Sequence, residues 1–172
     1  MGQHFTLNDV GKRKDIALKE QARVINTQTG MSALGRLRSG ETYNDQFFRA
    51  IAVFSCFDNM EARKLLFDLW INAPKAESGI FIDGRQNAEN LEVYAVLPEN
   101  IDRYRETLFD DSEVEDLPCN FRATTHTGFI TSALMISIYT NYLTNRYLRE
   151  PVRTIPFKTS FNIPLMLYED II

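Results

Sequence analysis

Asp58 and Lys14 are the two side chains whose type and position best suit chemistry. Asp58 directly follows the apolar run from Ala50 to Phe57, which predicts a strand, and Asn59 stands beside it. Ligands of parallel α/β sheets bind outside the carboxyl ends of the strands, where a carboxylate can hold Mg²⁺ that bridges nucleotide phosphates. Lys14 lies near the start of a predicted helix, and a lysine there can reach a phosphate as a point charge.

Both residues also have a simpler explanation. Asp58 fits the N-cap of the helix that follows the strand, and Glu61 would then complete a capping box. Lys14 is flanked by Lys12 and Arg13, and any one of the three could be the relevant cation. The sequence leaves both alternatives open.

Cys119 is a third candidate, because a thiolate is a strong nucleophile where cations or a helix N-terminus stabilise it. It follows an acidic stretch, residues 110–116, which disfavours the thiolate, whereas Arg122 and His126 favour it. The alternative is a buried structural thiol. His126 precedes a predicted helix and suits its N-terminal cap. Cys56 lies inside the predicted strand and is expected in the core.

The elements that must position these residues follow from hydrophobic periodicity. The spacing predicts a helix from Asp9 to Asn26, then the Ala50–Phe57 strand, whose continuous apolar run is typical of a parallel strand buried on both faces. A helix to about Asn72 and a strand at Gly79–Asp83 complete a strand–helix–strand unit. A further, weakly patterned strand is expected near Met31–Leu37.

The second half of the chain predicts a strand at Leu91–Leu97, a helix at Glu99–Leu108 and a long buried helix at Thr127–Tyr147. Alternation from Ile155 to Ile163 predicts a last strand. The fold class expected is α/β: a partial Rossmann-like doubly wound sheet with a mixed or antiparallel C-terminal part. Residues 1–172 are interpreted as a single domain.

The composition argues against several classes of function. Hydrophobic residues make up 44% of the 172 residues, the net charge is −4 and the pI is about 5.2. The sequence shows no basic patch, so nucleic-acid binding is not favoured. The apolar run from Phe129 to Tyr142 is too short to span a bilayer. Two distant cysteines indicate neither a disulfide framework nor a zinc site, and a cytoplasmic setting is expected.

Three segments carry a resemblance to a known family. Val10-Gly11-Lys12-Arg13-Lys14 with the helix to Asn26 resembles the V-G-x-x-K … I-N segment of the ThiF/ubiquitin-activating-enzyme superfamily. The segment from Val53 to Arg63, with Asp58-Asn59 and Arg63, resembles its strand–D-N-x-x-x-R segment. Ile82-Asp83-Gly84 resembles the strand that follows. The order and spacing of the three segments are those of the family.

The resemblance implies an adenylation domain that uses Mg-ATP to activate the C-terminal carboxylate of a ubiquitin-like or sulfur-carrier protein. It implies that Lys14 contacts the ATP phosphates, that Asp58 ligates Mg²⁺ with Asn59 beside it in the cofactor site, and that a loop in the region of Cys119 can carry a thioester-forming cysteine. Arg63 would brace the strand–helix corner. The family is usually dimeric, which implies a homodimer or heterodimer.

The chain departs from the family at its start. The family's first strand, its G-x-G-x-x-G-type loop, its ribose-binding acidic residue and its Asn-x-x-Arg-Gln stretch have no counterpart here. We therefore expect an N-terminally incomplete domain with an exposed sheet edge, either a truncated or split product or a chain that a partner completes. The alternative function is a non-catalytic, degenerate ThiF-like interaction module. A nicotinamide dehydrogenase is excluded because the dinucleotide fingerprint is missing.

Overall fold

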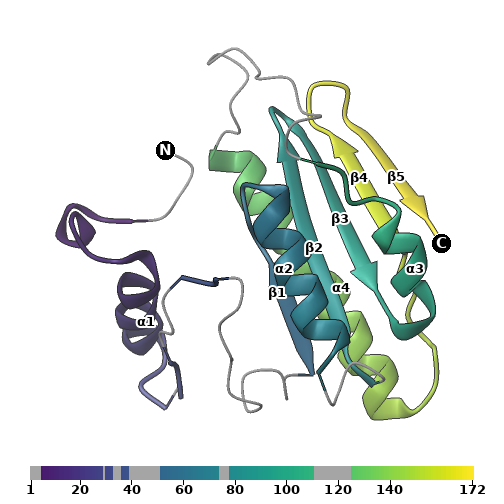
Figure 1. The fold of residues 1–172 in the computed structure, drawn as a ribbon, viewed down its shortest axis with the longest axis horizontal. Coiled ribbons are helices and arrows are strands. Elements are labelled where there is room, and N and C mark those ends of the chain that lie inside the picture. The colour runs from purple at the N-terminus through teal and green to yellow at the C-terminus, as the bar shows by residue number, and fades with distance from the viewer. Residues whose placement is uncertain (1–4, 29, 33–35, 39–50, 74–77, 111–124) are drawn as a thin grey trace. The chain divides into compact units, whose positions relative to one another are not determined.

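The computed structural model describes residues 5–28, 30–32, 36–38, 51–73, 78–110 and 125–172 (Figure 1). The chain forms two compact units, one of residues 3–38 and one that contains residues 39–172. The predicted strand near Met31–Leu37 falls partly outside the described residues, and its described residues are not in a strand.

The smaller unit contains a 3-10 turn, Leu7–Asp9, and one helix, α1 (Lys14–Ile25). The prediction that this helix begins at Asp9 was wrong by five residues. Asp9 instead closes the 3-10 turn by accepting hydrogen bonds from the backbone N–H and the hydroxyl of Thr6, both at 2.8 Å. Gly11 then adopts φ +85°, a left-handed conformation that interrupts the helix and that glycine tolerates.

The larger unit is built on a five-stranded mixed sheet in the order β1-β2-β3-β4-β5. Its strands are β1 (Ala52–Ser55), β2 (Ile80–Asn87), β3 (Asn90–Val96), β4 (Lys158–Asn162) and β5 (Leu167–Ile171). β1 is parallel to β2 and every other neighbouring pair is antiparallel. The predicted α/β class with a mixed sheet is confirmed, and so is the parallel strand–helix–strand unit. β5 was not predicted.

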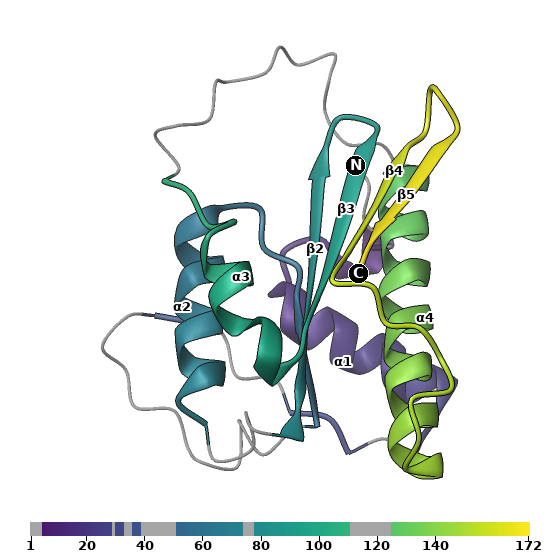
Figure 2. The same ribbon diagram turned by 90° about the vertical axis from the view of Figure 1, so that its right-hand side faces the viewer.

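Helices cover both faces of this sheet (Figure 2). α2 (Met60–Ile71) and α3 (Ile101–Arg105), the latter preceded by a 3-10 turn at Pro98–Asn100, lie on one face, and α4 (Thr125–Leu148) lies on the other. Strand alternation explains the two layers, because successive side chains of β2 point to opposite faces.

Each face has its own apolar core. On the α4 side the core consists of Ile80, Ile82, Val93, Ala95, Met135, Ile138 and Tyr142. On the other side four buried rings, those of Phe67, Trp70, Phe81 and Tyr104, pack with centroids 4.7–6.0 Å apart. Burial of such side chains stabilises the fold by roughly 1.5–3 kcal/mol each.

Two apolar segments are less buried than their sequences predicted. β1 was expected to be buried on both faces, but Ile51 and Phe54 are each 37% exposed. β1 is the first strand of the sheet, so among the described strands only β2 pairs with it. α4 buries Met135 and Ile138 against the sheet but exposes Phe129 and Ile136 on its opposite side. A continuous apolar run does not reveal which side of a helix has a neighbour.

The close approach of β2 to α4 yields a stability prediction. A Cβ atom on Gly84 would lie 2.7 Å from Met135 Sδ and 3.0 Å from Thr131 Cγ2, and both neighbours are buried. We expect Gly84→Ala to lower the free energy of unfolding by about 1–3 kcal/mol in urea denaturation, because the core must shift to accept the methyl group. Gly30→Ala, which meets no atom within 4 Å, is the control and should be nearly neutral. Equal stability of the two variants would contradict the packing described.

Candidate functional site at the carboxyl end of β1

The candidate site lies at the β1–α2 corner, residues 56–59, between the end of β1 and the first residue of α2. Asn59 is the N-cap of α2: its Oδ1 accepts a hydrogen bond from the Ala62 backbone N–H at 2.8 Å. The alternative that Asp58 caps this helix, with Glu61 completing a capping box, is therefore wrong. One residue separates the two possibilities, and a sequence pattern does not resolve helix starts that finely.

Because Asn59 forms the cap, the carboxylate of Asp58 is not used by the helix. Asp58 is exposed, and Asn59 Nδ2 donates to its Oδ1 at 3.2 Å. Asn59 thus orients Asp58 while its own carbonyl oxygen is engaged by the cap. The role of Asn59 in cofactor binding stays a prediction, and this geometry favours an indirect one.

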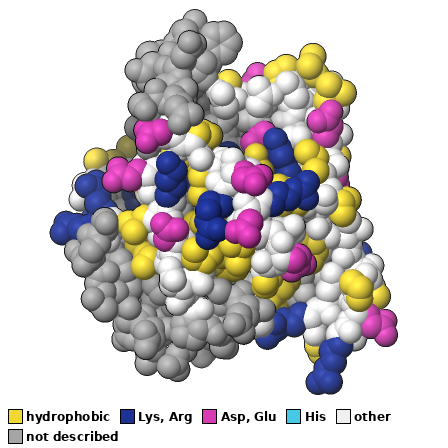
Figure 3. Space-filling view, turned by 45° about the vertical axis from the view of Figure 1, so that its right-hand side comes forward, with side chains coloured by type: hydrophobic (Ala, Val, Ile, Leu, Met, Phe, Trp, Pro, Cys, Tyr) yellow, Lys and Arg dark blue, Asp and Glu magenta, His cyan; other side chains and the backbone are white. Residues whose placement is uncertain are grey.

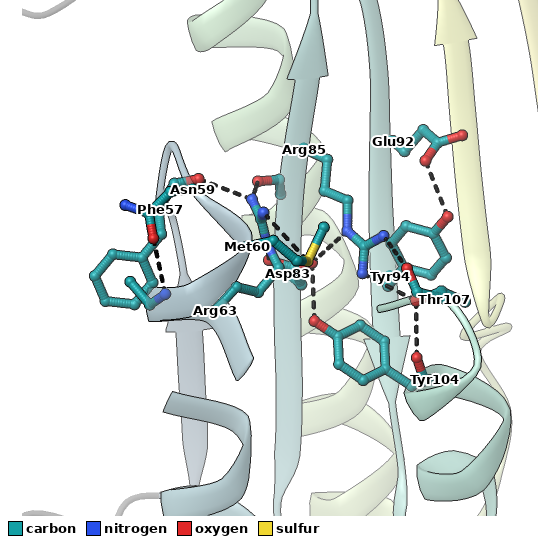
Figure 4. A network of polar contacts seen from close by, with 12 residues as sticks. Phe57, Asn59, Met60, Arg63, Asp83, Arg85, Glu92, Tyr94, Tyr104 and Thr107 are labelled. Atoms are coloured by element: carbon teal, nitrogen blue, oxygen red, sulfur yellow. Dashed lines mark hydrogen bonds and ion pairs between the residues drawn. The ribbon is translucent and has the colours of Figure 1, made fainter. Parts of the chain in front are cut away.

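Arg63 holds the corner onto the sheet (Figure 4). Its guanidinium donates to the Phe57 carbonyl at 2.8 Å, to Asp83 Oδ1 at 2.7 Å and to the Gly84 carbonyl at 3.4 Å. The Phe57 carbonyl immediately precedes Asp58, so the arginine fixes the backbone from which the exposed carboxylate projects. The predicted bracing role of Arg63 is confirmed.

Asp83 is the centre of the surrounding polar network. It is fully buried on β2 and receives Arg63 on Oδ1 and both Arg85 Nε (2.7 Å) and the Tyr104 hydroxyl (2.9 Å) on Oδ2. Arg85 also donates to the carbonyl and hydroxyl oxygens of Thr107, at 3.0 and 2.9 Å. We call Asp83, Arg63, Arg85 and Tyr104 the Asp83 cluster. It ties β2 to α2 on one side and to the end of α3 on the other.

The electrostatics of the Asp83 cluster follow from its burial. Burial, and next the charge of Asp83, raise the pKa of Tyr104 well above its ordinary value, so the phenol stays protonated and donates its hydrogen bond. Burial acts to lower the pKa of Arg85, but the Asp83 carboxylate more than offsets it and the pKa is raised. Arg85 also lies 4.3 Å from the centroid of the Tyr94 ring, a cation–π contact. One carboxylate is thus held between two permanent cations.

Lys14 is the first residue of α1 and is exposed. Of the three neighbouring cations, Lys12 pairs with Glu20 at 2.6 Å and Arg13 pairs with Asp15. Lys14 forms no ion pair within the part of the chain that the structure describes. Of the three cations that could contact a phosphate, Lys14 is therefore the one without a described ion pair.

The remaining candidates from the sequence are the two cysteines and His126. Cys119 lies outside the described residues, and its role stays a prediction. Cys56 follows β1 and is exposed, which corrects its expected place in the core. The pKa of the Cys56 thiol is nevertheless raised, mainly by burial of the sulfur atom and secondly by the negative charge of Asp83. The positive charge of Arg63 opposes this shift but does not cancel it, so the thiol form dominates at neutral pH. His126 Nε2 lies 3.2 Å from Glu89 Oε1.

The roles of Asp83, Arg85 and Tyr104 were not predicted from the sequence. One signal was available: Asp83 interrupts the apolar strand Ile80–Ile82, and a carboxylate inside a buried strand requires a charged partner. Which arginine supplies the charge is a question of tertiary packing, because Arg63 is twenty residues away along the chain.

Asp58 offers an exposed carboxylate at the corner that could hold a metal ion. In the described ranges no three His, Cys, Asp or Glu side chains converge as metal ligands. Mg²⁺ in nucleotide sites is commonly held by one or two carboxylates, with phosphate oxygens and water completing the octahedron. A single exposed carboxylate such as Asp58 suits that arrangement.

Comparisons with known proteins add no relative. No protein-family model matches the chain, and no curated protein matches it. No helix in the described part of the chain is long and apolar enough to cross a bilayer.

The buried ion pairs predict a large effect of removing one charge. Asp83→Asn keeps the shape but leaves the buried guanidinium of Arg63 and the half-buried one of Arg85 without their anion, and we expect the free energy of unfolding to fall by about 3–5 kcal/mol. Asp102→Asn makes the same change at an exposed ion pair with Arg105 and should cost less than about 1 kcal/mol. Urea denaturation of both variants measures the difference, and similar losses would contradict the central place of Asp83.

Tyr104 predicts a loss of stability in alkali. A tyrosine of the unfolded chain titrates near pH 10, whereas the pKa of folded Tyr104 is raised. Its contribution is fully present below about pH 10 and is lost above, because the unfolded state releases its proton first. In Tyr104→Phe the free energy of unfolding should fall less steeply between about pH 9 and 11. Tyr147→Phe, at a side chain 87% exposed, should keep the wild-type slope, and an unchanged slope in Tyr104→Phe would refute the assignment.

Proposed function

We propose that the chain is a ThiF-like adenylyltransferase domain that binds Mg-ATP at the β1–α2 corner and activates the C-terminal carboxylate of a ubiquitin-like or sulfur-carrier protein. One observation carries the proposal. The carboxylate of Asp58 stands exposed at the carboxyl end of a parallel strand, and Asn59 rather than Asp58 caps the helix. An exposed, oriented carboxylate at this position has no evident structural role.

Two further features support the proposal. β1 and β2 form a parallel pair joined by α2, the unit whose strand ends receive nucleotides in Rossmann-like folds. Among the described strands β1 lies at an edge of the sheet, where a Rossmann-like sheet could be extended. A partial Rossmann-like sheet is part of this proposal.

The proposed roles follow from charge. Asp58 would hold Mg²⁺, which neutralises phosphate charge when bound, and Asn59 would keep the carboxylate oriented. Lys14 belongs to the smaller unit, and its contact with the phosphates stays a prediction of the family resemblance. Arg63 would act only through the backbone it holds. Cys119 would carry a thioester if the chain proceeds beyond adenylation.

The second candidate is a non-catalytic ThiF-like module that pairs with an active partner. It is favoured by the corner itself, which Arg63 and the Asn59 cap hold in place without a ligand. A homodimer or heterodimer is expected under either candidate.

Calorimetric titration with Mg-ATP separates the two candidates. We expect saturable binding by the wild-type chain that weakens about tenfold or more in Asp58→Asn, because the isosteric change removes the metal-binding charge. Asp68→Asn, at an exposed position of α2, is the matched control and should bind like wild type. Absence of binding to the wild-type chain would reject nucleotide binding by this chain alone and favour the interaction module.

A further inference from the structure

The outer strand of the sheet, β5, exposes aliphatic, aromatic and acidic side chains along its length. All five of its residues are exposed, with Leu167 and Tyr168 each 54% and Ile171 44% exposed. β5 is the last strand in the sheet order, so no strand of the described residues pairs with its outer edge (Figure 1). Alternate backbone N–H and C=O groups of such an edge point outward without a strand partner.

The apolar surface continues into the turn between β4 and β5. Leu165 and Met166 are 65% and 74% exposed. The turn is nevertheless well formed: the Met166 N–H donates to the Ile163 carbonyl at 3.1 Å, and the Leu165 N–H donates to Asn162 Oδ1 at 2.9 Å. The β5 edge, as we define it, comprises Leu165, Met166, Leu167, Tyr168, Ile171 and Ile172 with the acidic pair Glu169 and Asp170. Apolar surface on a hydrogen-bonded turn and strand is typical of an interaction site.

β5 lacks three of the features that usually protect an edge, and its charged residues are both acidic. It contains no lysine, no proline and no bulge, and its five residues pair with β4 in continuous register. Only an extended strand can satisfy both its outward backbone groups and its alternating side chains. The occupant that fits the edge is therefore a β-strand.

The charges of β5 argue against a second copy of this chain as that occupant. The two-fold antiparallel register that pairs all five residues of β5 places Glu169 opposite the same residue of the other copy. Like charges directly opposite each other destabilise a strand pair. Within the described chain Glu169 forms no ion pair, because the nearby Lys158 is bound to Glu92.

The same charges favour a basic partner. Leu167, Glu169 and Ile171 point to one face of the sheet, the face that carries α2 and α3. On that face a shallow hollow is lined by Glu92, Ser160 and Glu169 among others. Figure 3 shows charged side chains of both signs and exposed hydrophobic surface interspersed on one side of the molecule. A partner strand that matches β5 on this face carries an apolar, a basic and an apolar residue at alternate positions.

We propose that the β5 edge is a docking site for an extended strand of a partner protein, with a lysine or arginine facing Glu169 and apolar residues two positions to either side. The inference is independent of the nucleotide site, since β5 and β1 are opposite edges of the sheet. The anchoring hydrogen bond from Arg103 to the Ile172 carbonyl, at 2.9 Å, holds the end of the strand in place before a partner arrives.

A designed peptide tests the proposal. The probe is a disulfide-closed hairpin whose outward strand reads Thr-Val-Thr-Lys-Thr-Val-Thr, a palindrome that presents the same pattern in parallel or antiparallel orientation. The control peptide has Glu in place of Lys. Closure of the hairpin reduces the ordering cost of binding. Binding to the full chain is followed by NMR through the backbone amides of β5.

We expect shifts confined to β4, β5 and their turn, and binding of the Lys peptide about fivefold or more tighter than that of the Glu peptide. Glu169→Lys should reverse this preference. Glu150→Lys, which makes the same charge change at an exposed position after α4, should retain it. Absence of shifts at β5, or equal binding of the two peptides, would overturn the proposal. So would a concentration-dependent dimer, detected by light scattering, whose interface maps to β5, because a second copy would then be the occupant.

Discussion

The buried carboxylate of Asp83 is the interaction on which the rest of the larger unit depends. It binds Arg63 of α2 through one oxygen, and Arg85 of its own strand and Tyr104 of α3 through the other. No apolar contact could position these elements as narrowly, because hydrophobic attraction is non-directional whereas a guanidinium meets a carboxylate at defined angles. The cluster thus sets how α2 and α3 sit on the sheet, and the aromatic core packs around it.

The candidate site is a consequence of that arrangement. Arg63 reaches past Asp83 to the Phe57 carbonyl, so the anchoring of α2 and the position of the β1–α2 corner are one interaction. Asn59 accepts a backbone hydrogen bond from the first turn of α2, and Asp58 remains exposed. The proposed metal site uses this fixed backbone and its exposed carboxylate. The same backbone would serve an interaction module equally well as a fixed corner.

Both edges of the sheet are open among the described strands, and they differ in chemistry. β1 is short, apolar and without charge, and its only described neighbour is parallel. β5 is antiparallel to β4, carries two carboxylates and exposes apolar side chains on both faces. The first is the edge at which a Rossmann-like sheet would be extended, and the second is suited to a separate basic strand. The two proposals therefore assign different partners to different ends of one sheet.

Local pattern was sufficient for much of the fold. The apolar runs around Val53, Ile82 and Val93 predicted the three strands, and the spacing of Leu66 and Trp70 predicted α2. The exposed side of α4 was predicted wrongly, because Phe129 and Ile136 have the same apolar character as Ile138 and only the neighbouring layer distinguishes them. β5 was not predicted, since its acidic pair hides the alternation of Leu167 and Ile171.

The sequence by itself determined the α/β class, the parallel unit around α2 and the candidacy of Asp58, because these follow from periodicity and from the residue that ends a strand. Only the tertiary structure decided that Asn59 rather than Asp58 caps α2, that Asp83 joins two arginines and a tyrosine, and that β1 and β5 form the edges. Caps depend on single backbone dihedrals, buried ion pairs join residues distant in the chain, and strand order is set by non-local pairing. None of these three is encoded in a local pattern of residue types.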